Sequence, residues 1–322
     1  ITGVTEQTAN QKFKLYSSLN NFNKAENELK KLIKLSPKET KYYGMLGELY
    51  QSKGLNDKAL ETYNELLRMD STNAYIHLSL ADYYRSMKEN DKSYNELKLA
   101  FNNRNLDIDT KINILLSYYS VTQTFSELKI QAMELCEILT RVHETEAKSH
   151  SMYGDFLFRE KEFEKARKEY RRTIELDKSK YPVWHQLLDI ESRLSDYDAM
   201  LKEGKEAMEL FPSQPLPYLV SGLANSQKKN YKEAVEVLKA GVEFAFDNKP
   251  LKSQFFALIG DALHEDKQIK ASDEAYEESI RHDPKNATVL NNYSYYLSLR
   301  NENLEKAEQM SKRSLEIDPE ND

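Results

Sequence analysis

The chain has 322 residues, of which 39% are hydrophobic and 31% are charged. Its formal net charge is −7 and its basic residues are scattered, which argues against nucleic acid as the main partner because phosphate binding needs a concentrated basic face. The single cysteine, Cys136, excludes an internal disulfide, and no run of about 18 apolar residues predicts a membrane span.

The first two predicted elements are helix pairs over residues 6–39 and 40–73. Apolar residues recur in both at steps of three and four, which predicts amphipathic helices with one buried face. The second pair is the clearer one, with apolar or small residues at Tyr43, Leu46, Gly47 and Tyr50 and then at Ala59, Tyr63 and Leu66. Gly47 and Ala59 are small residues on neighbouring helices, and we expect them to let the two backbones approach closely. A turn is predicted around Gly54.

The same pattern continues along the chain with a period of 34 residues. Seven further repeats are predicted at 74–107, 108–146, 147–180, 181–214, 215–248, 253–286 and 287–321. The repeat at 108–146 is irregular, with five extra residues near Val121 to Phe125, and four residues, Lys249 to Lys252, precede the eighth repeat. With only 8 prolines and 9 glycines and no alternating apolar runs, the chain is predicted to be all-α, in a single array over residues 1–322.

This period and helix–turn–helix form resemble the tetratricopeptide repeat. The resemblance implies a right-handed α-solenoid of about nine helix pairs, whose first helices line a concave channel that can hold a partner's peptide segment. It thus implies a non-enzymatic scaffold or adaptor that binds a protein or peptide. Two alternatives remain open: the regulatory repeat region of a longer multidomain enzyme, and a structural scaffold that self-assembles as a homodimer through its C-terminal end, Leu304 to Pro319.

No constellation of catalytic or metal-binding residues is visible. The six histidines include no His-Glu-x-x-His pattern, and no Gly-rich loop follows a strand. His77 and His150 share a repeat position that holds aromatic residues elsewhere, which favours packing or hydrogen bonding. Cys136 occupies a core position, so we expect a buried, inert thiol. The charged run from Arg159 to Arg172 predicts a solvated outer face. We therefore predict no enzyme activity, no metal and no cofactor.

One feature of the repeats points to a binding surface. We number each repeat from its first residue, so that Thr40 is position 1 of the second repeat. Position 9 then carries a carboxylate in five repeats, at Glu48, Asp82, Asp155, Asp189 and Asp261. Stacking would align them on the concave wall as an acidic track for a basic segment of the partner. The alternative, which the spacing favours, is local pairing with arginines three or four residues later. The full set of predicted partner-binding residues is Glu48, Tyr75, Asp82, Arg85, Asp155, Arg159, His185, Asp189, Arg193, Asp261 and Tyr295.

The partner and the cellular location are less constrained. Tetratricopeptide repeat proteins that grip a partner's C-terminal carboxylate use a Lys and an Asn at positions 5 and 9, and the well-formed repeats here lack that combination. The overall pattern resembles long bacterial repeat proteins. Because the chain begins at Ile1 without methionine, we expect a fragment or a processed product, which favours the cell envelope slightly over the cytoplasm.

Overall fold

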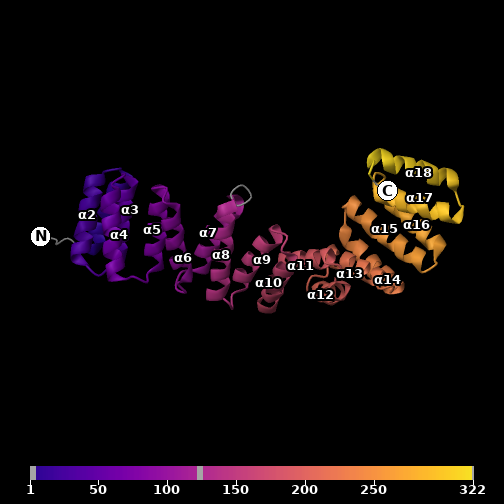
Figure 1. Cartoon of the computed structure of the whole chain (residues 1–322), viewed down its shortest axis with the longest axis horizontal. Coiled ribbons are helices and arrows are strands. Elements are labelled where there is room, and N and C mark those ends of the chain that lie inside the picture. Colours follow the sequence, from indigo (N-terminus) through magenta and orange to yellow (C-terminus); the bar gives the residue numbers. More distant parts are fainter. Residues whose placement is uncertain (1–4, 122–125, 321–322) are drawn as a thin grey trace. The chain divides into compact units, whose positions relative to one another are not determined.

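The computed structural model describes residues 5–121 and 126–320. Within these ranges the chain forms eighteen α-helices and one short 3-10 helix and no strand (Figure 1). The fold is an all-α solenoid of helix pairs, which confirms the predicted fold class. The extra residues expected near Val121 to Phe125 fall almost wholly outside the described residues.

The chain divides into two compact units, up to Phe156 and from Leu157 onwards. The helices of the first unit pair in chain order as antiparallel hairpins. They are α1 Glu6–Ser18, α2 Phe22–Leu35, α3 Thr40–Ser52, α4 Asn56–Met69, α5 Ala74–Ser86, α6 Asn90–Asn102, α7 Ile108–Val121 and α8 Ser126–Val142. Helix α9, Ala147–Arg159, contains the boundary.

The second unit continues the helix pairs. Its elements are α10 Phe163–Leu176, α11 Tyr181–Arg193, α12 Tyr197–Leu210, α13 Pro215–Gln227, α14 Tyr231–Val242, η1 Glu243–Ala245, α15 Lys249–Glu265, α16 Ile269–His282, α17 Ala287–Arg300 and α18 Leu304–Ile317. The four residues predicted as an insertion, Lys249 to Lys252, form the first turn of α15. This helix has 17 residues, whereas α13 has 13.

The turn between the two helices of a pair has the same backbone conformation throughout the described residues. One residue with a φ between 52° and 70° follows the first helix of each pair, namely Asn20, Gly54, Lys88, Lys161, Ser195, Lys229, Lys267 and Asn301. The residue directly after it bonds back into the first helix. For example, the amide of Leu55 donates to the carbonyl oxygen of Tyr50 at 3.0 Å. This is the left-handed cap that ends helices, and only Gly54 adopts it without the cost of a Cβ atom.

The core between the two helices of a pair depends on one close contact. A Cβ atom built on Gly47 would lie 2.4 Å from Cε1 of Tyr63, a ring that is completely buried. Gly222 meets Leu238 in the same way, and Gly260 meets Tyr276. The sequence had suggested Ala59 as the neighbour of Gly47. Tyr63, one turn beyond Ala59, fills the space that the glycine leaves. At the two equivalent repeat positions elsewhere, the hydroxyl groups of Ser93 and Ser272 donate to the carbonyl oxygens of Ala81 and Gly260 at 2.7 and 2.8 Å, as the expected close approach of the two helices requires.

Candidate protein-binding groove

A groove in the first compact unit crosses the first helices of three successive pairs. It consists of two hollows of ≈ 330 Å³ and ≈ 700 Å³. Both are lined by Glu48, Tyr75 and Ser79, so they form one continuous depression over α3, α5 and α7. We call it the first-unit groove. First helices line it because their apolar residues face the second helices, which leaves the opposite face open.

The first-unit groove has an apolar floor and a polar rim. Met45, Ile76, Leu78 and Ile114 contribute apolar surface from all three helices. Tyr75 stands between the two hollows with 59% of its surface exposed. An exposed aromatic side chain over an apolar floor is typical of the anchor positions of protein interfaces.

Two carboxylates, Glu48 and Asp82, line the larger hollow of the first-unit groove together with Arg85, while Lys41 lines the smaller one. Burial raises the pKa of Glu48, and the charge of Asp82 raises it further. The two groups therefore repel each other across the larger hollow, which both of them line. Asp82 also forms an ion pair with Arg85, but both side chains are more than half exposed and such pairs are weak in water. The local pairing expected at this position is thus present, and it leaves Glu48 unneutralised.

The predicted residues on α11, in the second compact unit, form a local cluster. Nε of Arg193 donates to Oδ2 of Asp189 at 2.8 Å. The guanidinium group of Arg193 also lies over the rings of Phe158 and Phe163, at 5.8 and 5.5 Å from their centroids. His185 is exposed, with its ring 6.1 Å from that of Tyr181. Here the structure gives the acidic residue a cationic partner.

A third hollow, of ≈ 390 Å³, lies within the second compact unit and is lined by Asp261. The hydroxyl group of Tyr276 donates to Oδ1 of Asp261, and burial raises the pKa of this carboxyl group. The hydrogen bond from Tyr276 therefore fixes the position of the Asp261 carboxyl group. Tyr295 is 58% exposed and does not line the hollow, although its ring lies 5.8 Å from that of Tyr296, which does.

The eleven predicted residues thus fall into several places. Glu48, Tyr75, Asp82 and Arg85 meet in the first-unit groove. Asp155 and Arg159 are half-buried on α9, and the remaining five belong to the second unit. A single acidic track along the whole array stays a prediction. Sequence reasoning missed the polar face of α7, where Thr110, Asn113 and Ser117 line the groove. Their spacing of three and four residues was the available signal.

The buried histidines and the cysteine have structural surroundings. Nδ1 of His77 lies 2.7 Å from Oε2 of Glu96, and Nε2 of His150 lies 3.0 Å from the carbonyl oxygen of Glu144. Burial raises the pKa of Cys136 well above its ordinary value, so it stays a thiol, as expected. Among the described residues we find no cluster of three or more His, Cys, Asp or Glu side chains suited to a metal ion. The same part of the chain holds no helix with the length and apolar character of a membrane span.

Comparison with known proteins identifies the repeats. The tetratricopeptide repeat family model matches residues 14–39, from the last part of α1 through α2, and 40–73, the pair α3 and α4. This match and the recurrence of the helix pair throughout the described fold support a protein of the tetratricopeptide repeat family. Repeats of this kind form protein-interaction scaffolds, and families built from them are typically non-enzymatic.

Two curated relatives extend the match. The chain is 23% identical to BBSome complex member BBS4 of Bos taurus over 317 residues, which is 95% of this chain and 52% of the bovine protein. It is 24% identical to tetratricopeptide repeat protein 21A of Homo sapiens over 232 residues, 63% of this chain and 17% of the human protein. The chain therefore spans about half the length of the first relative and less of the second.

Similar solved structures include MamA of Desulfovibrio magneticus and a repeat protein of Cytophaga hutchinsonii. The MamA structure has a TM-score of 0.48 at 19% identity, covering 55% of this chain and 97% of that one. The Cytophaga structure has a TM-score of 0.47 at 15% identity, covering 77% of this chain and 98% of that one.

Proposed function

We propose that this protein is a non-enzymatic scaffold or adaptor that holds a segment of a partner protein in the first-unit groove, and that the segment carries a basic side chain. The observation that carries the proposal is the pair of carboxylates, Glu48 and Asp82, beside the exposed ring of Tyr75. The two carboxylates, the apolar floor and the exposed ring of Tyr75 lie together in one depression, which is lined by α3, α5 and α7.

The chemistry of the groove favours a cation from the partner. Within the described residues Glu48 forms no ion pair, and its raised pKa shows that its charge is poorly stabilised in the free protein. A lysine or arginine side chain between Glu48 and Asp82 would offset both the burial and the mutual repulsion. Because the carboxylates are partly solvated, they would act mainly on the rate of encounter and on the orientation of the segment.

A peptide-binding experiment tests the proposal. Fluorescent peptides of equal length, with lysine and arginine or with glutamate and aspartate at random positions, are titrated against the parent protein and the double variant Glu48→Gln/Asp82→Asn. Basic peptides should bind the parent preferentially and lose affinity as salt rises. The double variant should lose at least about fivefold in affinity for them.

The matched control removes the same charge from another face. Glu61→Gln/Glu65→Gln changes two exposed carboxylates on α4, outside the groove lining. This control should bind as the parent does. Equal losses of affinity in both double variants would show that only the net charge matters. No loss of affinity in either variant would contradict the proposed site.

A second copy of the chain is a further candidate partner, because α18 exposes apolar side chains. Leu304, Leu315 and Ile317 are exposed by 53%, 46% and 40%. A homodimer contact through α18 would cover them. Light scattering over a concentration series should then show dimers that Leu315→Lys dissociates, whereas a monomer at every concentration would rule this contact out.

A further inference from the structure

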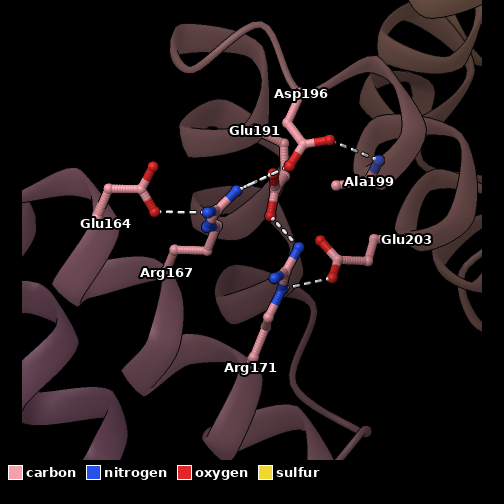
Figure 2. A network of polar contacts seen from close by, with 7 residues as sticks. All are labelled: Glu164, Arg167, Arg171, Glu191, Asp196, Ala199 and Glu203. Atoms are coloured by element: carbon pink, nitrogen blue, oxygen red, sulfur yellow. Dashed lines mark hydrogen bonds and ion pairs between the residues drawn. The ribbon is translucent and has the colours of Figure 1, made fainter.

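Six charged side chains converge among three helices of the second compact unit (Figure 2). On α10, Arg167 donates through Nη1 to Asp196 at 2.9 Å and to Glu191 at 3.3 Å, and it also binds Glu164. Arg171, one turn further along α10, donates through Nη2 to Glu191 at 2.9 Å and through Nε to Glu203 at 2.7 Å. Glu191 lies on α11 and Glu203 on α12, so the network ties the three helices together.

The two glutamates at the centre are the buried members. The side chain of Glu191 is 0% exposed, and that of Glu203 is 6% exposed. Within the described residues, Oε2 of Glu203 is buried and has no hydrogen-bond partner. An ionised carboxylate oxygen without a donor is costly in such a place.

The balance of charge in the network also favours one bound proton at Glu191 and Glu203. The two arginines face three carboxyl groups, those of Glu191 and Glu203, which are buried, and that of Asp196, which is 40% exposed; Glu164 is 66% exposed to solvent. If all three carboxyl groups were ionised, one negative charge would be left unbalanced beside two buried side chains. One proton neutralises it. Two acidic groups that share a site cannot both ionise easily, so one of them keeps its proton to a higher pH.

We propose that Glu191 and Glu203 share one proton, and that release of this proton to solvent as the pH rises loosens the packing of α11 against α10 and α12. In the protonated form the carboxyl group of one glutamate donates to a carboxylate oxygen of the other, and Arg171 binds both. After release, both groups are anions that compete for the same guanidinium group. The pair would therefore act as a pH-sensitive device within the array.

The pKa of Glu191 agrees with this arrangement. Burial raises it to about 7, and the hydrogen bond and charge of Glu203 add to the rise, while Arg171 and Arg167 oppose it. The other facing groups are Glu164 on α10 and Asp196 at the start of α12. Helix α13, which packs on α11 and α12, contributes no Asp, Glu, Lys, Arg or His side chain.

The sign of the pH effect follows from the direction of this shift. The folded pKa of Glu191 lies above the ordinary value of 4.5, so the protonated form stabilises the fold fully below that value. The stabilisation is lost as the pH rises through about 7. Because α11 also carries Asp189 and Arg193, the state of the buried pair would influence a helix that presents charged groups at the surface.

Amide hydrogen exchange at about pH 6 and about pH 8, corrected for intrinsic exchange rates, tests the proposal on the whole chain. In the parent, protection in α11 and α12 should fall by about tenfold or more over this range, while protection in α3 and α4 changes much less. Glu203→Gln should remove most of the fall, since its amide can donate to Glu191 at any pH. Glu164→Gln, which changes the exposed carboxylate of the same network, should keep the parent's behaviour.

Infrared spectroscopy of the parent provides a second readout that does not depend on a variant folding. A buried protonated carboxyl group should be visible at about pH 6 and lost by about pH 8, with Glu191→Gln or Glu203→Gln abolishing the signal. Absence of this signal in the parent would overturn the proposal. So would a pH dependence of α11 and α12 that Glu203→Gln leaves unchanged.

Discussion

The ammonium group of Lys111 lies 2.8 Å from Nε2 of His143 in the interior of the first compact unit. Its Nζ also donates to the carbonyl oxygens of Phe101 and Asn103, both at 2.8 Å. Three acceptors match the three N–H bonds of the ammonium group, so His143 carries its own proton on Nδ1. Lys111 is completely buried, and burial lowers its pKa to about 8. A lysine of α7 thus joins the end of α6 to the end of α8.

The substitution Lys111→Met should destabilise the first unit by about 1–3 kcal/mol, because two buried carbonyl groups lose their donor. Urea denaturation followed by circular dichroism measures the change. Lys148→Met is the matched control, since Lys148 pairs with Asp109 while both side chains are 60% exposed, and it should change stability much less than Lys111→Met. Equal effects of the two substitutions would show that the buried hydrogen bonds contribute nothing.

A second prediction concerns the pH dependence of His77. Its hydrogen bond with Glu96 raises the pKa of the imidazole above 6.5. The protonated form therefore stabilises the fold below this value, and the contribution is lost as the pH rises through the folded pKa. Glu96→Gln should lower the pKa of His77 and reduce stability at about pH 6 by about 1 kcal/mol, with little change at about pH 9. NMR titration of the imidazole protons checks this, and a pKa unaffected by Glu96→Gln would refute it.

The close contact between Gly47 and Tyr63 gives a third prediction. Gly47→Ala should destabilise by about 1–3 kcal/mol, because the added methyl group would overlap a buried ring. Gly44→Ala lies on the same helix with nothing within 4 Å of the new Cβ atom, and it should stabilise by up to about 1 kcal/mol. In thermal denaturation, the melting temperature should fall for Gly47→Ala and rise for Gly44→Ala, each relative to the parent protein. If both stabilise, the ring of Tyr63 has room to move.

A fourth prediction concerns the last helix pair. The structure buries Tyr293 and Leu297 of α17, to 3% and 0% exposure. On α18 the apolar residues Leu304, Leu315 and Ile317 are exposed, so α18 should exchange its amide hydrogens faster than α16. Mass spectrometry after exchange in deuterated water measures the two helices directly. Equal protection in a protein that light scattering shows to be monomeric would contradict this expectation.

The sequence was sufficient for the fold class and the family because both depend on spacing. Residues such as Leu46 and Tyr63 recur with the helical period and then with the repeat period, and the confirmed all-α class follows from that alone. The recurring left-handed turn was harder to see. Seven of its eight described residues are not glycine, so residue type carried almost no signal and only the common position did.

The charged network could not be predicted in the same way. The run from Arg159 to Arg172 has the alternating charges of a solvated face, yet its Arg167 and Arg171 bind the buried Glu191 and Glu203. Those partners lie 20 to 32 residues away along the chain. Periodicity identifies which face of a helix is polar, but it does not identify which polar groups a neighbouring helix will cover. Periodicity likewise selected Glu48, Tyr75, Asp82 and Arg85, which line the first-unit groove, but it did not indicate that the polar face of α7 lines the same groove.

The extra turn at the start of α15 has a consequence for the phase of the array. Four residues add about 400° of helical rotation, which leaves the following side chains only about 40° from their former direction. The left-handed turn accordingly moves from Lys229 to Lys267, a step of 38 residues, and the next step to Asn301 returns to 34. An insertion of two residues would instead turn the buried face of α15 outward. Lengthening by one whole turn is thus the kind of insertion that a first helix in this array can absorb while its inner face stays inside.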